Sequence, residues 1–341
     1  MKNKIGCLFM ISLLVFTSCQ KSDTDTTLHS PKKEEKIQIG FSFDSFVIER
    51  WIRDRDVFIS TARELGADVI TQNANGDVEE QISQIEYLIE KKMDVIVILP
   101  GDCDGMKDVV KKARSKGIKV IAYDRQITDT DVDLYITFDG KEVGRLKAQA
   151  VLDHIEPGGK VGMILGSQKD YNTILMEEGI EEVFTGEDVE IVFKEYAEGW
   201  LEEKGAQYVN TYVQDEDTID ALICGNDNVA GKAIMALAEK RLAGSIYVTG
   251  QDANTDACQR IVEGTQHMTV YKSVEKEAKK AAQYAVMLGR GEDLMIEEQY
   301  ETGSAVVPFV EFNPVAVNKE NMDEVITNQF HSDEEVYLNM R

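Results

Sequence analysis

Ten polar or aromatic side chains directly follow short apolar runs, or begin the polar stretches that come after those runs. These residues are Arg50, Trp51, Asp124, Arg125, Asp170, Asn172, Trp200, Asn226, Asp252 and Lys272. Carboxylate, amide and guanidinium groups bind hydroxyl groups, each of which both donates and accepts, and an aromatic ring can cover the apolar C–H face of a sugar. We therefore expect these residues to form a sugar-binding site.

Two tryptophans occur in the chain, and each lies beside charged residues rather than inside an apolar run. Trp51 follows Arg50, and Trp200 follows Gly199 ahead of a charged stretch. For each, the alternative to a binding role is that the ring only covers the start of a helix. Charged groups strengthen hydrogen bonds to hydroxyls, and a polar group left unpaired in a closed cleft costs about 1–3 kcal/mol. That cost would give the site its selectivity among sugars.

Short β-rich runs alternate with longer amphipathic stretches from residue 36 onward. The expected strands are 37–43, 68–72, 95–99, 118–123, 134–137, 161–165, 189–193, 221–224, 247–249 and 268–270. The expected helices are 50–65, 78–92, 105–116, 172–184, 201–213 and 229–241. Such alternation buries both faces of a parallel sheet, and the pattern begins again after residue 138. The predicted fold class is therefore α/β, with two doubly wound parallel-sheet lobes.

A weak internal repeat supports two lobes. Residues 94–101 resemble residues 219–226, and each stretch is followed by a helix and a second strand that ends in Asp124 or Asp252. Ligands of open α/β sheets bind beyond the carboxyl ends of the strands, so we expect two such edges to face each other across a cleft. The N-terminal lobe is assigned to 36–138 plus 272–290 and the C-terminal lobe to 139–271 plus 291–330, with three hinge segments. Residues 331–341 are expected to be a frayed tail.

The N-terminus predicts export. Lys2 and Lys4 precede an apolar run of about twelve residues, too short for the roughly 20 that span a bilayer, so a signal peptide over 1–18 is expected. Cys19 follows in the manner of a bacterial lipobox and is expected to be acylated, with an ordinary signal peptide as the alternative. Residues 19–35 then form a polar tether. The mature chain is expected at the outer face of the cytoplasmic membrane or in the periplasm.

Composition excludes several other functions. A net charge of −25 disfavours nucleic acid, and a sugar-responsive repressor would carry a basic helix-turn-helix in place of the export signal. Cys103, Cys224 and Cys258 give no disulfide framework and no zinc spacing, and no cofactor motif is present.

The remaining motifs favour no catalytic or metal site. Asp129, Asp131 and Asp133 alternate as in a calcium loop but lack its glycine and its glutamate. His154 and His267 stand in no catalytic motif, so a surface or packing role is expected for both. Asp124 and Asp252 could pair as in a glycosidase, but nearby Arg125 and Lys272 favour ionised carboxylates.

Seven stretches, taken in order, closely resemble bacterial periplasmic D-xylose-binding proteins. They are 49–51, 73–76, 122–125, 198–201, 226–227, 250–253 and 268–272. The similarity extends from about residue 36 to about residue 331. It implies a type I periplasmic-binding fold that is not an enzyme and that holds D-xylose or a close monosaccharide. Tyr171 and the loop 101–104 depart from the family pattern.

The resemblance also implies roles for the site residues and partners for the chain. Trp51 and Trp200 would sandwich the sugar ring. Arg50, Asp124 and Arg125 would bind hydroxyls from the first lobe, and Lys272 would complete the site near the hinge. The second lobe would contribute Asp170, Asn172, Asn226 and Asp252. The partner would be an ABC permease or, alternatively, a membrane sensor histidine kinase.

Overall fold

The computed structural model describes residues 36–340. The expected signal peptide, Cys19 and the tether over 19–35 lie outside these residues. Within them, no helix combines the length and the apolar character that crossing a bilayer requires.

The first sheet has seven strands in the order β11-β12-β5-β4-β3-β1-β2. Their bounds are β1 (Gln38–Phe43), β2 (Asp68–Asn73), β3 (Val95–Leu99), β4 (Lys119–Tyr123), β5 (Leu134–Phe138), β11 (Gln299–Glu301) and β12 (Val306–Phe312). All neighbouring pairs are parallel except β11 with β12. Every residue of β3 is buried, because helices cover both faces of the sheet.

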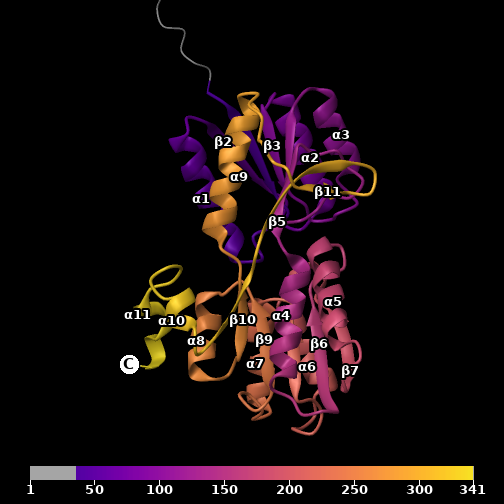
Figure 1. The fold of residues 1–341 in the computed structure, drawn as a ribbon, viewed down its shortest axis with the longest axis vertical. Helices are drawn as coiled ribbons and strands as arrows, with labels where there is room; N and C mark the ends of the chain where they lie inside the picture. Colours follow the sequence, from indigo (N-terminus) through magenta and orange to yellow (C-terminus); the bar gives the residue numbers. More distant parts are fainter. Residues whose placement is uncertain (1–35, 341) are drawn as a thin grey trace, which may run out of the picture. The chain divides into compact units, whose positions relative to one another are not determined.

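Four helices cover this first sheet. They are α1 (Arg50–Glu64), α2 (Val78–Glu90), α3 (Lys107–Ser115) and α9 (Val274–Gly289). One apolar core joins α1 and α9 to Phe41 and Val97, and the other joins α2 and α3 to Ile96 and Ile98. Since alternate strand residues enter opposite cores, α1 and α9 share one face and α2 and α3 the other (Figure 1).

The second sheet has six strands in the order β13-β10-β9-β8-β6-β7. Its strands are β6 (Gly159–Leu165), β7 (Val189–Tyr196), β8 (Ala221–Cys224), β9 (Tyr247–Gln251), β10 (Met268–Tyr271) and the antiparallel β13 (Val315–Asn318). The helices packed on it are α4 (Gly140–Leu152), α5 (Tyr171–Phe184), α6 (Glu203–Tyr212), α7 (Asp227–Glu239) and α8 (Thr255–Glu263). The predicted fold class, two α/β lobes, is confirmed.

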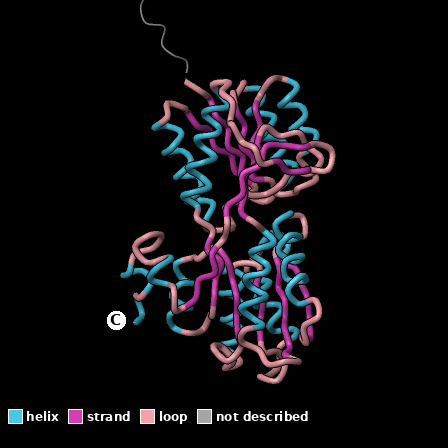
Figure 2. Tube along the Cα trace, viewed as in Figure 1, coloured by secondary structure: helices cyan, strands magenta, loops and turns pink. Residues whose placement is uncertain are grey.

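Three connections join the two sheets in the described part of the chain (Figure 2). They follow β5, β10 and β12. Here the assignment of residues 291–330 to the C-terminal lobe was wrong, because β12 pairs in parallel with β5 and extends the first sheet. Only β13 and the residues after it belong to the second lobe. The strand with which an edge strand pairs can be far away in the sequence, and local periodicity does not reveal that pairing.

The C-terminal segment packs against the second lobe, so the prediction of a frayed tail was also wrong. The short helices α10 (Met322–Val325) and α11 (Asp333–Val336) precede a single 3-10 turn, η2 (Leu338–Met340). Val336 is fully buried in a core that contains Ile261 and Val262 of α8. His331 Nε2 lies 2.7 Å from the carbonyl oxygen of Ala253. Phe330 and Tyr337 pack against the same core, and a capping box at Ser332 and Glu335 fixes the start of α11.

Candidate functional site

The predicted site residues follow the carboxyl ends of strands in both lobes. Asp124 and Arg125 come after β4, Asp252 after β9 and Lys272 after β10, while Trp200 ends the 3-10 turn η1 (Glu198–Trp200) after β7. Arg50 and Trp51 begin α1, Asp170 and Asn172 lie at the start of α5, and Asn226 caps α7. All are buried except Asn172, which is partly exposed. The parallel topology thus brings residues from 50 to 272 to facing sheet edges.

Asp124 and Asp252 occupy equivalent positions in the two lobes. Each is the first residue after its strand, and each has a positive φ, 58° for Asp124 and 95° for Asp252. Non-glycine residues adopt this conformation at a cost, and such residues cluster at ligand sites. The two equivalent residues thus share a left-handed conformation directly after their strands.

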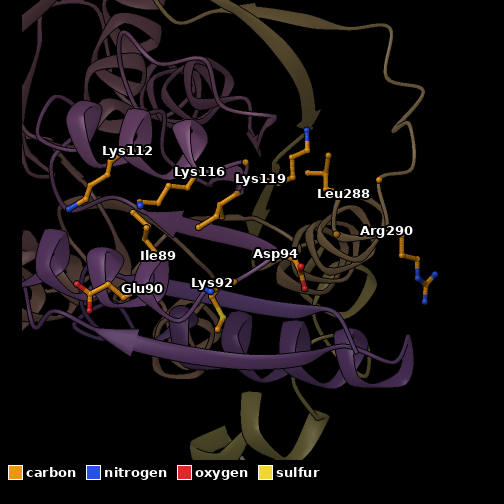
Figure 3. A pocket seen from close by; sticks show the side chains of 14 residues that line it. Ile89, Glu90, Lys92, Asp94, Lys112, Lys116, Lys119, Leu288 and Arg290 are labelled. Atoms are coloured by element: carbon orange, nitrogen blue, oxygen red, sulfur yellow. The ribbon is translucent and has the colours of Figure 1, made fainter. Parts of the chain in front are cut away.

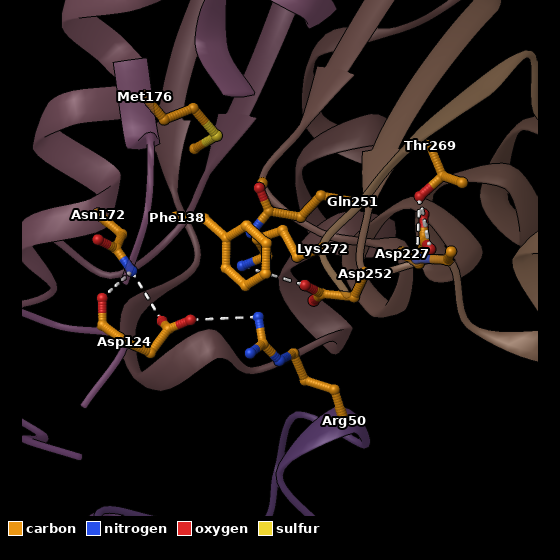
Figure 4. A network of polar contacts seen from close by, with 12 residues as sticks. Arg50, Asp124, Phe138, Asn172, Met176, Asp227, Gln251, Asp252, Thr269 and Lys272 are labelled. Carbon is orange, nitrogen blue, oxygen red and sulfur yellow. Dashed lines mark hydrogen bonds and ion pairs between the residues drawn. The ribbon is translucent and has the colours of Figure 1, made fainter. Parts of the chain in front are cut away.

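Arg50 is the centre of a buried carboxylate cluster. Its guanidinium group lies 2.8 Å from Glu277, 3.2 Å from Asp54 and 3.2 Å from Asp124. Tyr123 donates a hydrogen bond to Asp54. Burial lowers the pKa of Arg50, but these carboxylates outweigh it and raise that pKa well above its ordinary value. Arg50 is therefore a permanent cation held in one orientation (Figure 4).

Arg125 joins the two lobes. Its Nη1 donates to Asp44 at 2.6 Å and to the carbonyl oxygen of Pro100 at 3.0 Å, and its Nε lies 2.6 Å from Asp170 Oδ2 in the other lobe. Trp200 Nε1 donates to the same Asp170 oxygen at 3.0 Å. The other Asp170 oxygen caps α5 through the backbone N–H of Asn172. A single carboxylate thus fixes a helix start, an indole and a cation across the cleft.

Trp200 has room for its ring because two glycines lie beneath it. A Cβ atom added at Gly166 would stand 2.3 Å from the indole, and one added at Gly225 would stand 3.1 Å from it. Both glycines follow strands, β6 and β8 respectively. Larger side chains at these positions would displace the ring.

These groups surround a small, closely filled cavity of about 10 Å³ between the lobes, with room for about one water molecule. Its lining residues are Asp124, Phe138, Gly140, Val143, Asn172, Met176, Trp200, Gln251 and Lys272. Asn172 Nδ2 donates to Asp124 Oδ1 at 2.8 Å across the lobes, and Lys272 Nζ lies 3.3 Å from Asp252 (Figure 4).

Trp51 does not line this cavity. Instead, guanidinium groups lie over its ring, with the Cζ atoms of Arg50 and Arg125 at 4.4 Å and 5.6 Å from the ring centroid. A sandwich of the sugar ring between Trp51 and Trp200 thus stays a prediction.

Several buried polar atoms of these residues make no hydrogen bond within the described structure. Arg125 Nη2, Asn172 Oδ1, Asn226 Nδ2 and Trp51 Nε1 are of this kind. Unpartnered buried groups are rare in folded proteins, because each costs about 1–3 kcal/mol. Both donors and acceptors are represented, so a ligand that supplies both kinds of group, as a polyhydroxylated molecule does, fits the set.

The charges around the cavity favour a neutral ligand. Arg50, Arg125 and Lys272 are the cations of the network, and more carboxyl groups than cations contact them. Burial, followed by the nearby Asp124, raises the pKa of Glu277 well above its ordinary value. For Asp124, burial acts to raise the pKa, but Lys272, Arg50 and Arg125 together lower it. An anionic ligand would meet surplus negative charge here.

Sequence reasoning missed Gln251, Phe138 and Met176, which line the cavity. Gln251 and Phe138 are the last residues of β9 and β5, and Met176 lies one helical turn after Asn172. The rule that ligands bind at strand ends would have identified the first two, had it been applied to the final strand residue as well as to the next one.

The two departures from the family pattern both lie where the lobes touch. Tyr171 Oη lies 3.3 Å from Tyr300 Oη of β11. In the loop 101–104, Asp102 lies 3.4 Å from Lys169, and the backbone N–H of Cys103 donates to the carbonyl oxygen of Lys169 at 3.1 Å. These residues therefore contribute to contact between the lobes rather than to the cavity lining.

The alternating aspartates are paired with cations. Asp129 lies 3.0 Å from Lys107, Asp131 lies 3.0 Å from Arg114, and Asp133 lies 3.0 Å from Lys119. Arg114 also pairs with Asp133, so the three carboxylates and these cations form a network of ion pairs.

A larger hollow lies at the opposite end of the first sheet (Figure 3). Asp94 and Lys119, which line it, stand at the amino ends of β3 and β4, and Lys112 and Lys116 add positive charge. None of the predicted site residues lines this hollow. Ligands of open α/β sheets bind at the other strand ends, so this hollow is not the predicted site.

The chain is similar to known proteins over most of its length. Residues 39–293 match the model of a family described as periplasmic binding protein domain. A D-xylose-binding periplasmic protein of Haemophilus influenzae is 38% identical over 92% of this chain and 96% of its own. One of Escherichia coli is 40% identical over 89% and 93%.

The fold of this chain is also similar to that of a solved structure. It is a carbohydrate transporter solute-binding protein from Chloroflexus aurantiacus in complex with D-glucose. Its TM-score is 0.80 at 26% identity, and the match covers 87% of this chain and 98% of that one. The chain belongs to the periplasmic binding protein family.

Proposed function

We propose that this protein binds D-xylose or a close monosaccharide in the cavity between its lobes and delivers it to an ABC transporter. The observation that carries the proposal is the set of unpartnered buried atoms on Arg125, Asn172 and Asn226, which belong to both lobes. Hydroxyl groups of a pyranose supply the missing donors and acceptors. The names of the relatives from H. influenzae and E. coli support D-xylose as the ligand.

Binding and closure are linked in this proposal. A ligand favours the closed arrangement only through contacts that it makes there and nowhere else. The sugar would bridge Arg50 and Asp124 of one lobe to Asn226 and Asp252 of the other. A transporter would then recognise the closed form. The similarity to the carbohydrate transporter solute-binding protein of C. aurantiacus supports transport over sensing.

The test is a titration of residues 36–341 with a panel of pentoses and hexoses, followed by tryptophan fluorescence and calorimetry. We expect saturable binding of D-xylose, with weaker binding of sugars that differ at one hydroxyl. Absence of heat and of spectral change with every sugar would refute the proposal. Co-purification from membranes then identifies the partner, and recovery of a histidine kinase in place of a permease would refute the transport step.

We also propose that the chain is exported and anchored through Cys19, and that it has no catalytic activity. Support for the anchor comes from the apolar run after Lys4 and the cysteine that follows it. Mass spectrometry of the mature N-terminus is the test, with Cys19→Ala as the control. We expect diacylglyceryl mass on the wild-type peptide and release of the variant from membranes; an unmodified cysteine would refute the anchor. Recovery of unchanged sugar after incubation tests the absence of catalysis.

A further inference from the structure

Lys147 is a fully buried lysine beneath the cavity. It lies on α4, on the same side as Gly140 and Val143, which line the cavity. Its Nζ lies 2.9 Å from the carbonyl oxygen of Gly225 and 3.0 Å from that of Cys224. It also lies 3.2 Å from Met176 Sδ and 3.3 Å from Gln251 Oε1. All four partners are uncharged acceptors, so no carboxylate explains the burial of this cation.

The contact with Lys147 determines which end of the Gln251 amide faces the cavity. An ammonium group has donors only, so it requires the oxygen of the amide and leaves the nitrogen on the other side. Gln251 ends β9 and lines the cavity, and no group among residues 36–340 accepts a hydrogen bond from its Nε2 (Figure 4). A free donor is therefore presented beside Lys272 and Phe138.

A donor at this place complements the carboxylates nearby. The carboxylates of Asp124 and Asp252 accept the protons of sugar hydroxyls, and the lone pairs of those hydroxyls and of the ring oxygen then need donors. We propose that Lys147 is a positioning residue that fixes the Gln251 amide so that Nε2 donates a hydrogen bond to an oxygen of the bound sugar. The inference rests on the proposed function and identifies a specificity residue within it.

Loss of the Lys147 proton would release this orientation. A neutral amine keeps two donors, which the carbonyls of Cys224 and Gly225 can take, and gains a lone pair that can accept from Gln251 Nε2. The amide can then turn and present its oxygen to the cavity. Burial lowers the pKa of Lys147 to about 7, with Asp252, Cys224 and Asp227 acting to raise it and Lys272 to lower it. The orientation is therefore expected to weaken as the pH rises through neutrality.

Three variants separate the amide from the fold. Gln251→Glu keeps an oxygen for Lys147 and removes the donor, so we expect the thermal midpoint to be maintained while the Kd for D-xylose rises about tenfold at pH 6. Lys147→Met keeps the length of the side chain and frees the amide, with a similar rise in Kd. Lys141→Met is the matched control, because Lys141 is a partly exposed residue of α4 that pairs with Glu178 at 2.8 Å outside the cavity. The affinity of this variant for D-xylose is expected to stay unchanged.

The pH profile distinguishes positioning from simple support of the fold. We expect the Kd of the wild type to rise more steeply than the Kd of Lys147→Met as the pH passes upward through about 7. Burial also raises the pKa of Asp227 to about 7, but that group is present in both proteins and cancels in the comparison.

If the wild type binds D-xylose and Gln251→Glu binds it with the same affinity, this inference is overturned and the proposed function is not. Failure of the wild type to bind any sugar would overturn the proposed function and this inference with it. If Lys147→Met does not fold, Gln251→Glu and the wild-type pH profile decide the question.

Discussion

Arg125 Nε of one lobe lies 2.6 Å from Asp170 Oδ2 of the other, and both side chains are buried. The pair connects the two halves of the site, because Arg125 is held by Asp44 and Asp170 holds the indole of Trp200. Truncation of one partner of a buried charge pair costs about 2–5 kcal/mol, much of it from the charge left unpaired.

Asp170→Asn tests this connection. Asparagine caps helices as well as aspartate does, so we expect α5 to remain intact while the affinity for D-xylose falls by about 30-fold or more. Calorimetry measures the affinity, and circular dichroism checks the fold. The control is Asp77→Asn, which changes the capping residue of α2 outside the cleft and is expected to leave the affinity unaltered. Equal affinities of the two variants would contradict the prediction.

The two tryptophans are expected to report ligand binding unequally. Trp200 lines the cavity and donates to Asp170, whereas Trp51 is covered by two guanidinium groups. With Trp51→Phe we expect most of the fluorescence change on adding D-xylose to persist. With Trp200→Phe we expect most of it to disappear and the affinity to fall. Should the signal survive only in Trp200→Phe, the ligand would contact Trp51 instead, contrary to the lining described above.

Much of the fold could be read from the sequence because strands buried on both faces stand out as short apolar runs. The run 95–99 is such a case, since all its residues are buried in β3. The pairing of β12 with β5 could not be read in this way, because nothing local to residues 306–312 specifies a partner some 170 residues away. Burial of Val336 against α8 is likewise a tertiary effect.

The site was predictable to the extent that strand ends are. Asp124 and Asp252 follow their strands, and the structure gives both the same left-handed turn. Lys147 carried no signal, because a lysine in an amphipathic helix is usually solvated, and only the packing of α4 over β8 and β9 buries it. Trp51 was assigned to the sugar face from the resemblance to D-xylose-binding proteins, and its contact with the Arg50 guanidinium became visible only in three dimensions.

Gly144 is expected to be essential for the position of α4. A Cβ atom there would stand 2.0 Å from the backbone oxygen of Met176 on α5, and a Cβ at Gly179 would stand 2.0 Å from the backbone oxygen of Lys141. We expect Gly144→Ala to lower the free energy of unfolding by about 1–3 kcal/mol and to weaken sugar binding, because Met176 lines the cavity.

Gly231→Ala is the matched control for this change. Gly231 lies inside α7, and its Cβ would meet only side-chain atoms, the guanidinium of Arg260 at 3.1 Å, and no backbone. Alanine favours a helix over glycine by up to about 1 kcal/mol, so no loss of stability is expected. Urea denaturation of both variants gives the comparison. If Gly144→Ala is as stable as Gly231→Ala, the two helices do not touch at their glycines.

Stability is expected to fall on acidification because His267 is held neutral in the folded protein. The backbone N–H of Val248 donates to His267 Nδ1 at 3.1 Å, so that atom cannot carry a proton. Burial, and then the neighbouring His154, lowers the pKa of His267 to about 4. Below the ordinary imidazole pKa of about 6.5, His267 binds a proton in the unfolded chain but stays neutral in the folded protein. The contribution of neutral His267 to the free energy of unfolding is therefore fully present above pH 6.5 and is lost as the pH falls toward 4.

His267→Asn removes the titration and keeps an acceptor for Val248. We expect the difference in thermal midpoint between pH 7.5 and pH 4.5 to be smaller in this variant than in the wild type. His154→Asn is expected to give an intermediate result, since it removes only the weaker of the two causes and leaves His267 buried against Tyr247, with 4.5 Å between ring centroids. A gap between wild type and His267→Asn that stays constant from pH 7.5 to 4.5 would show that His267 acts through packing alone, because a packing contribution has no proton to gain or lose.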